Sequence, residues 1–260
     1  MKEDQGTSAR RFIVNDVLTA GAFELPPDQA RHASRVLRLR VGDAILLFDA
    51  RGHEIDAHIV AIDKDRVCVE TSGGMRERPA EIPIVLGQGI PKGKKMDAIV
   101  RHGTELGVTV FQPLLLSRCI PRLEAERVDT RLRRWKRIAE EACRQCRRTD
   151  IPSVEAPLSL EAFCALFTAL PQAGGILLYE NAADAPLLPC IEHMVDSGAP
   201  IWIVIGPEGG LEPDEVDRAR AAGFQVAGLG PSIVRTQTAS LAALAGIRLV
   251  REARRTVSKR

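Results

Sequence analysis

The sequence predicts an α/β protein in which a domain built on a parallel sheet follows a small β-rich domain. Two observations predict the parallel sheet. Residues Ile201 to Ile205 are apolar at every position, which is typical of a strand covered on both faces. From Ile82 onward, strand-like and helix-like runs alternate, as they do when helices connect parallel strands. The β-rich domain is predicted because short strand-like runs separated by turn residues fill the region from Arg11 to about Thr71.

The N-terminal region is expected to form a small barrel with one helix. The helix is predicted over Pro26 to Leu37, where Ala30, Ala33 and Leu37 share one face. The stretch from Ser72 to Pro79 contains adjacent glycines and charged residues, and we expect it to be a linker. One domain is therefore expected over residues 1–75 and a second over residues 80–260. The strands expected in the barrel are Phe12–Val14, Ala44–Phe48, Glu54–Ile62 and Arg66–Glu70.

The second domain begins with a strand and a helix. The helix is predicted after Pro91 and ends at Gly107, with Met96, Ile99 and Val100 on its buried side. A later basic helix carries an apolar stripe that includes Trp135 and Cys143. The other elements expected before Ile201 are strands over Ile82–Ile90, Val108–Leu116 and Gly175–Tyr179, the basic helix within Arg122–Arg148, and a helix near Leu160–Leu170.

Two loops are predicted at one edge of the sheet. The strand Ile201–Ile205 ends in the sequence GPEGG, Gly206 to Gly210, which neither a helix nor a strand continues through. Glu212 is expected to cap a helix that has Pro213 at its first position and Gly223 just past its end. A short strand from Phe224 to Leu229 then leads into a second loop, Gly230 to Thr236, and the last helix is expected to begin near Thr238.

The loops indicate a ligand without phosphate groups. Ligands of parallel α/β sheets bind at the carboxyl ends of the strands, where glycines allow the backbone to approach them. Neither GxGxxG nor GxxxxGK[ST] occurs, and the carboxylate of Glu208 would repel a pyrophosphate. A neutral or cationic ligand is favoured. S-adenosylmethionine fits this description because it carries a sulfonium and an adenosine but no phosphate.

The charge is small overall and uneven along the chain. The net charge of the 260 residues is +2, yet residues 122–148 contain ten Lys and Arg against five Asp and Glu. Such a basic segment indicates either a polyanionic partner or solvated helix faces. The first residues are polar and no apolar run approaches 18 residues, so neither a signal peptide nor a membrane span is expected and a cytoplasmic location is predicted.

The six cysteines do not predict a metal site. Only Cys143 and Cys146 are closely spaced, and no second CxxC or HxxxH exists to complete a zinc site. Both cysteines fall on the apolar stripe of the basic helix, so we interpret them as core residues. No metal is expected.

Several stretches in order resemble one known family. GPEGG, followed by a helix and then by LGPSIVRTQTA, closely resembles the GPEGG and LGxxILRxETA pair of the bacterial small-subunit ribosomal RNA uridine N3-methyltransferases, members of the SPOUT superfamily. Val234 and Gln237 depart from this pattern, where the family has leucine and glutamate. The likeness extends from Arg11 to about Arg251 through the stretches HASRVLRLRVGD, KGKKMDAIVRHGTELGV and RWKRIAEEACRQCRR.

This resemblance implies a fold, a reaction and partners. The expected fold is a SPOUT-type domain with a C-terminal trefoil knot, preceded by a PUA-like domain that binds RNA. The expected reaction is methylation of N3 of a uridine in small-subunit (16S) ribosomal RNA by S-adenosylmethionine, with the small ribosomal subunit as partner. A homodimer is also expected, and the last helix, Ser240 to Val250, is the candidate surface for it or else ordinary core.

The candidate site residues fall into three groups. Arg235 is the first candidate to stabilise charge on the uridine oxygens, the alternative being a structural arginine that bridges the two loops. Glu208 is a weaker candidate base, which could instead accept hydrogen bonds from the loop or the cofactor; the sequence does not identify the base. The expected cofactor contacts are Leu178, Tyr179, Glu180, Gly206, Pro207, Glu208, Gly209, Gly210, Leu229, Gly230, Ile233, Val234, Thr236 and Thr238, and the expected RNA contacts are His32, Arg35, Arg38, Arg40, Lys92, Arg134 and Arg144.

Three other functions stay open at this point. A non-catalytic RNA- or ribosome-binding protein needs the basic segments but not the glycine loops. A SPOUT methyltransferase could act on a different RNA nucleotide. A nucleotide-dependent oxidoreductase on a doubly wound sheet would need a phosphate-binding loop, which the sequence lacks.

Overall fold

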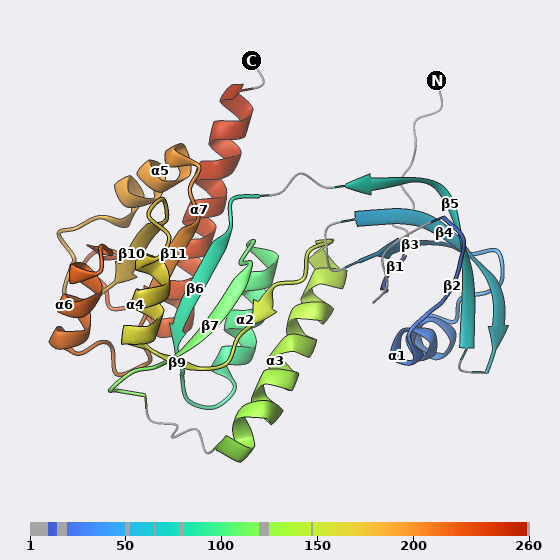
Figure 1. Ribbon diagram of the computed structural model, residues 1–260, viewed down its shortest axis with the longest axis horizontal. Helices are drawn as coiled ribbons and strands as arrows, with labels where there is room; N and C mark the ends of the chain where they lie inside the picture. Colours follow the sequence, from blue (N-terminus) through green and yellow to red (C-terminus); the bar gives the residue numbers. More distant parts are fainter. Residues whose placement is uncertain are drawn as a thin grey trace. The chain divides into compact units, whose positions relative to one another are not determined.

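The computed structural model describes residues 10–14, 20–49, 53–64, 66–77, 81–119, 125–146 and 148–258 (Figure 1). The chain divides into two compact units. The first contains Met1–Ala80 and Cys143–Ile151, and the second contains Glu81–Ala142 and Pro152–Arg260.

The first unit is built on a five-stranded sheet in the order β1-β3-β4-β5-β2. β1 pairs with β3 in parallel and the other neighbours are antiparallel. Phe12, Leu47, Ile59 and Val69 belong to its core and are fully buried. The predicted β-rich domain is therefore confirmed, although the three-residue strand β2 was not foreseen. The strands are β1 (Arg10–Ile13), β2 (Ala22–Glu24), β3 (Ala44–Phe48), β4 (His53–Asp63) and β5 (Arg66–Glu77).

The predicted linker is wrong up to Glu77, because β5 continues through this segment. Ser72 pairs with Asp56, and Arg76 pairs with Glu54 across a shift in register. The guanidinium of Arg76 also donates to Asp56 at 2.6 Å. Gly73, with φ of 89°, marks an irregularity within the strand, a common role of strand glycines. The predicted linker residues Arg78 and Pro79 lie outside the described residues.

The predicted helix of the first unit forms in two parts. A short α-helix, α1 (Pro27–Arg31), leads directly into a π-helical turn, η1 (His32–Val36). Ala30 and Ala33 are buried, as the pattern predicted. The turn ends before Arg38, whose φ of 51° takes the backbone out of the helical region.

The second unit is built on a seven-stranded sheet in the order β12-β10-β11-β6-β7-β8, with β9 also beside β7. Each described pairing is parallel, so the predicted parallel sheet is confirmed. The strands are β6 (Ile84–Gly89), β7 (Val110–Leu115), β8 (Ser153–Val154), β9 (Leu158–Ser159), β10 (Gly174–Leu178), β11 (Ile201–Ile205) and β12 (Gln225–Ala227).

Two apolar clusters cover the two faces of this sheet. Along β11, Ile203 belongs to one cluster and its neighbours Trp202 and Val204 to the other, as alternating strand side chains require. The first cluster receives side chains from α2 (Lys95–Glu105), α3 (Ala125–Cys146), α5 (Leu187–Ser197) and α7 (Thr236–Ser258), and the second from α4 (Leu160–Thr168) and α6 (Pro213–Ala221). The sheet therefore lies between two helical layers (Figure 1).

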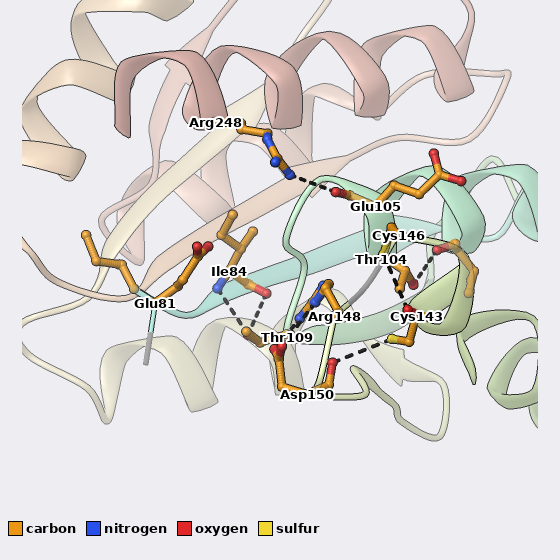
Figure 2. Close-up of polar contacts among 12 residues, drawn as sticks. Glu81, Ile84, Thr104, Glu105, Thr109, Cys143, Cys146, Arg148, Asp150 and Arg248 are labelled. Carbon is orange, nitrogen blue, oxygen red and sulfur yellow. Dashed lines mark hydrogen bonds and ion pairs between the residues drawn. The ribbon is translucent and has the colours of Figure 1, made fainter. Parts of the chain in front are cut away.

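The last helix differs from its prediction at its start. α7 begins at Thr236, two residues before the expected Thr238. Further along, Arg248 donates to the backbone carbonyl of Glu105 at 2.9 Å, which ties α7 to the end of α2 (Figure 2). α5 had no predicted counterpart. The trefoil knot that the resemblance implies stays a prediction.

Among the described residues, no helix combines the length and the apolar character needed to cross a membrane.

Candidate active site

A cavity of about 420 Å³ lies at the carboxyl ends of three neighbouring strands of the second unit. One wall follows β10, a second follows β11 and is the GPEGG loop, and a third follows β12 and runs into α7. The lining residues are Leu178, Tyr179, Glu180, Ile205, Gly206, Pro207, Glu208, Gly209, Gly210, Leu229, Gly230, Ser232, Ile233, Val234, Arg235, Thr236 and Ala239.

The cavity contains every predicted cofactor residue except Thr238, and it also contains the predicted catalytic residue Arg235. Thr238 is exposed and lies outside the lining. Because α7 begins at Thr236, one helical turn brings Ala239 to the cavity in its place. Ala239, Ile205 and Ser232 are the lining residues that the sequence analysis missed. If the start of the last helix had been predicted at Thr236, Ala239 would have been expected at the cavity.

The first loop depends on glycine at two places. A Cβ at Gly206 would lie 3.0 Å from the backbone carbonyl carbon of Gly210. Gly210 has φ of 73°, and a Cβ there would meet the carboxylate of Glu180 at the end of β10. The chain can therefore turn tightly here only without side chains.

Arg118, which follows β7, fixes this loop against α6. Its guanidinium donates to the two carboxylate oxygens of Glu212 at 2.8 and 3.1 Å and to the backbone carbonyl of Gly209 at 2.8 Å. This hydrogen-bonded pair holds the pKa of Glu212 below its ordinary value. Glu212 precedes α6, as predicted, and its backbone N–H donates to Glu215. Through these hydrogen bonds, Arg118 connects the GPEGG loop, α6 and the end of β7.

Glu208 is tethered to the start of α2. Its carboxylate accepts from Lys95 Nζ at 2.6 Å and from the backbone N–H of Lys92 at 3.0 Å. Burial raises the pKa of Glu208, but the hydrogen bonds from Lys95 and from backbone N–H groups outweigh it, so the pKa is lowered overall. A carboxylate that is stabilised as the anion is a weak base. These contacts favour the alternative role, in which Glu208 accepts hydrogen bonds within the protein.

Replacing Glu208 with glutamine is expected to leave the shape of the pH–rate profile unchanged. Because the folded pKa lies below the ordinary value, the ion pair with Lys95 is fully formed above the unfolded pKa and is lost only as the pH falls through the folded one. Activity should fall by less than about tenfold, since partly exposed ion pairs contribute about 0–1 kcal/mol. The check is kcat from about pH 5 to about pH 9. Abolished activity at every pH would restore Glu208 as the base.

Arg235 lines the cavity and is exposed to solvent. Among the described residues, its guanidinium has no hydrogen-bond or ion-pair partner, so no bridge between the two loops forms through it. Its backbone carbonyl accepts from Ala239 N–H at 2.9 Å, which places it just before α7. The backbone of Arg235 is therefore held in place, and its guanidinium is available to a ligand.

The predicted RNA contacts differ in their exposure. His32, Arg35, Arg38 and Arg40 are exposed along one segment of the first unit. Lys92 is exposed in the second unit. Arg134 donates to Asp97 at 2.6 Å with 54% of its side chain exposed, and the half-buried Arg144 has Nη1 enclosed without a partner among the described atoms. Arg144 is therefore the least suited of these residues to contact a phosphate.

The two closely spaced cysteines belong to the first unit and behave as packing residues. Cys143 is fully buried, and its thiol donates to the carbonyl of Asp150 at 3.5 Å (Figure 2). Burial raises the pKa of the Cys143 thiol to about 12. Within the described part of the chain, no group of three His, Cys, Asp or Glu side chains could hold a metal ion.

Cys143 is expected to resist alkylation in the native protein. Thiolates are the reactive form of cysteine, and a thiol with a pKa of about 12 is almost fully protonated at neutral pH. Iodoacetamide followed by peptide mass spectrometry should label Cys143 only after denaturation. Native labelling as fast as that of the half-buried Cys68 would contradict this prediction.

Fold and cavity together define an α/β protein with a small-molecule site at the carboxyl ends of its parallel strands. Residues 78–248 match the family model of the RNA methyltransferase domain, and residues 25–72 match that of the RNA methyltransferase PUA domain. The chain belongs to this RNA methyltransferase family.

Named relatives span most of the chain. Ribosomal RNA small subunit methyltransferase E of Bacillus subtilis is 31% identical over 233 residues, which are 88% of this chain and 90% of the relative. The crystal structure of the Neisseria gonorrhoeae protein of the same name, bound to S-adenosyl methionine, is similar with a TM-score of 0.82 and 32% identity over 93% of this chain and 98% of that one. A Legionella pneumophila methyltransferase in complex with the same cofactor has a TM-score of 0.81 and 28% identity over 95% and 98% of the two chains.

Proposed function

We propose that this chain is an S-adenosylmethionine-dependent methyltransferase that methylates N3 of a uridine in small-subunit ribosomal RNA. The observation that carries the proposal is the cavity between the GPEGG loop and the loop before α7. Relatives named small-subunit ribosomal RNA methyltransferases, two thirds or more of whose length matches this chain, support the RNA substrate. The choice of N3 of uridine comes from the resemblance of the two loop sequences.

The residues of the cavity fit this cofactor. A volume of about 420 Å³ lies within the range of about 300–1,000 Å³ that is usual for small-molecule sites. The charged lining residues are Glu180, Glu208 and Arg235. Because Lys95 pairs with Glu208, the carboxylate of Glu180 is the one in this lining without a partner among the described residues, and it disfavours a pyrophosphate and suits a cofactor with positive charge. Among the described residues, no hydrogen bond reaches the carboxylate of Glu180, which leaves it available to a ligand. Gly206 and Gly210 bring backbone groups to the cavity surface.

When bound, S-adenosylmethionine supplies a methyl group that is already activated by a sulfonium. The work left to the protein is alignment of the two reactants and control of charge. As N3 of uridine loses its proton, negative charge develops on O2 and O4, and the free guanidinium of Arg235 is the cationic group of the cavity that can stabilise it. Glu208 holds the loop against α2 through Lys95.

The N-terminal unit supplies RNA binding in this proposal. Its match to the PUA domain of RNA methyltransferases and the exposed His32, Arg35, Arg38 and Arg40 support this role. We assign RNA binding to residues 1–75 and methyl transfer to residues 80–260. The assembled small subunit is the proposed substrate, and the cytoplasm, where ribosomes assemble, is the proposed location.

A homodimer is proposed through α7. Leu241 and Leu249 lie two helical turns apart on this helix and are 42% and 71% exposed, and Ile233 in the preceding loop is 85% exposed. A second copy of the chain would cover these side chains, of which Ile233 lines the cavity. Light scattering after size exclusion should give the mass of a dimer, and Leu249→Glu should shift it toward the monomer. A monomeric wild-type protein at micromolar concentration would contradict the proposal.

The reaction is tested by transfer of labelled methyl from S-adenosylmethionine to small ribosomal subunits that lack their own modification, followed by nucleoside analysis. Label in N3-methyluridine is the expected result. Label in another nucleoside would keep the enzyme class and overturn the target. Absence of label together with absence of cofactor binding would favour a non-catalytic RNA-binding protein.

A further inference from the structure

Gln88 is a polar residue at the end of an apolar strand. β6 begins with Ile84, Val85 and Leu86, and Gln88 follows in the same strand with no exposure to solvent. It does not line the cavity. Burying an amide is unfavourable unless its hydrogen-bonding groups find partners, so a fully buried glutamine in a central strand calls for a structural reason.

The amide of Gln88 connects the two loops that enclose the cavity. Its Nε2 donates to Thr236 Oγ1 at 2.9 Å and lies 3.3 Å from the carbonyl oxygen of Gly206. Thr236 Oγ1 in turn donates to the same carbonyl at 2.6 Å. Gly206 is the first residue of the GPEGG loop, and Thr236 ends the second loop and begins α7. Both residues line the cavity from different walls.

The orientation of the amide follows from its partners. Nε2 also lies 2.9 Å from the carbonyl oxygen of Gly89, and a carbonyl oxygen only accepts, so the amino group must face this side. On the other side, the hydroxyl of Ser240 lies 2.7 Å from Gln88 Oε1 and 2.9 Å from the carbonyl oxygen of Thr236, and Gln88 Oε1 is the nearer acceptor for its one proton. Glutamine meets both requirements, because its amino group donates to the acceptors on one side and its oxygen accepts from Ser240 on the other. A glutamate would point a carboxylate oxygen at two carbonyls, and a leucine would leave the hydroxyl of Ser240 without this acceptor.

We propose that Gln88 is a positioning residue for the cofactor: it fixes the distance between the two loops without touching the ligand. This inference rests on the proposed function, because it concerns the cofactor of that reaction. The network joins β6, β11 and α7, which are far apart in the sequence. Losing it frees the start of α7 from the GPEGG loop and widens the range of cavity shapes, so cofactor binding must then supply the ordering that the protein no longer provides.

The test compares two matched variants, Gln88→Leu and Gln112→Leu. Gln112 is also a buried glutamine, lies on the neighbouring strand β7, and donates to the carbonyl of Ala156 at 2.6 Å. It does not line the cavity, and among the described residues it forms no hydrogen bond with either loop. Both variants should lower the melting temperature. Only Gln88→Leu should raise the Kd for S-adenosylmethionine, by about tenfold or more, the order expected when buried polar groups lose their partners.

Steady-state kinetics separate positioning from general destabilisation. Gln88→Leu should raise the KM for the cofactor more than it lowers kcat, measured below the melting temperature of both variants. Equal Kd values for Gln88→Leu and the wild type, or equal losses of affinity in the two leucine variants, would overturn the inference. A wild-type protein that binds no S-adenosylmethionine would instead overturn the proposed function, and the inference with it.

Ser240→Ala provides a milder test if Gln88→Leu does not fold. It removes the donor to Gln88 Oε1 and lies outside the cavity lining. The Kd should rise about threefold, as expected for loss of one hydrogen bond. In the Gln88→Leu background the same change should have a smaller effect on the Kd, because the bond to Gln88 is already absent and only the contact with the carbonyl of Thr236 is left to lose. A Ser240→Ala protein with wild-type affinity would contradict the network's role.

Discussion

Replacing Arg235 with alanine is expected to lower kcat for methyl transfer by about 100- to 1,000-fold, the usual cost of losing one group that stabilises transition-state charge. Its guanidinium lines the cavity without a partner among the described residues, so its removal leaves no buried charge unpaired. Stability should therefore change by no more than about 0.5 kcal/mol. Affinity for the cofactor should change little, because the charge on the uridine develops during the reaction.

The control for this prediction is Arg220→Ala. Arg220 is an exposed arginine of α6 that pairs with Asp217 and does not line the cavity. Single-turnover rates with small subunits and cofactor titrations would be measured for both variants. If Arg235→Ala keeps the wild-type rate, the developing charge is stabilised by another group and the assignment of Arg235 is wrong.

Replacing Gly210 with alanine is expected to weaken cofactor binding by about tenfold or more. A left-handed backbone costs a residue with a Cβ about 1–2 kcal/mol, and Gly210 has φ of 73°. The added methyl group would also displace the carboxylate of Glu180 from the cavity wall. Strain and displacement act on the same loop, so the loss should appear as a higher Kd for S-adenosylmethionine and a higher KM in the transfer assay.

Gly230→Ala separates the two causes. Gly230 also lines the cavity and has φ of 88°, but a Cβ there would meet no atom within 4 Å. It should therefore show the backbone strain alone and lose less affinity than Gly210→Ala. Equal losses in the two variants would mean that contact with Glu180 does not matter, and wild-type affinity in both would remove the argument for glycine in these loops.

The sequence was most informative where local pattern and ligand chemistry coincide. The apolar run Ile201–Ile205 predicted a buried parallel strand, and the glycines after it predicted a loop that approaches a ligand. The structure has both, with the loop forming one wall of the cavity. The start of α6 was also predicted correctly, because Glu212 and Pro213 cap a helix through contacts with residues next to them in the sequence.

The sequence was least informative about contacts between distant segments. Gln88 reaches Thr236 across 148 positions, and Arg118 reaches Glu212 across 94. Contacts between residues so far apart in the sequence cannot be predicted from its periodicity or composition. The glycines at 73 and 74 indicated a linker by composition, whereas Ser72 and Arg76 on either side of them pair with β4, so the glycines lie within the strand β5 at a shift in register. Thr236 begins α7 where its hydroxyl donates to Gly206, a contact that local propensity does not contain.

The most direct test of the central claim is a calorimetric titration of the protein with S-adenosylmethionine, with ATP and NAD as competing candidates. The cavity between the glycine loops predicts one S-adenosylmethionine per chain, weakened in Gly210→Ala and unchanged in Arg220→Ala, and no binding of the phosphate-bearing nucleotides because the carboxylate of Glu180 faces them. Absence of S-adenosylmethionine binding, or binding that Gly210→Ala leaves intact, would contradict the assignment of this cavity as the cofactor site.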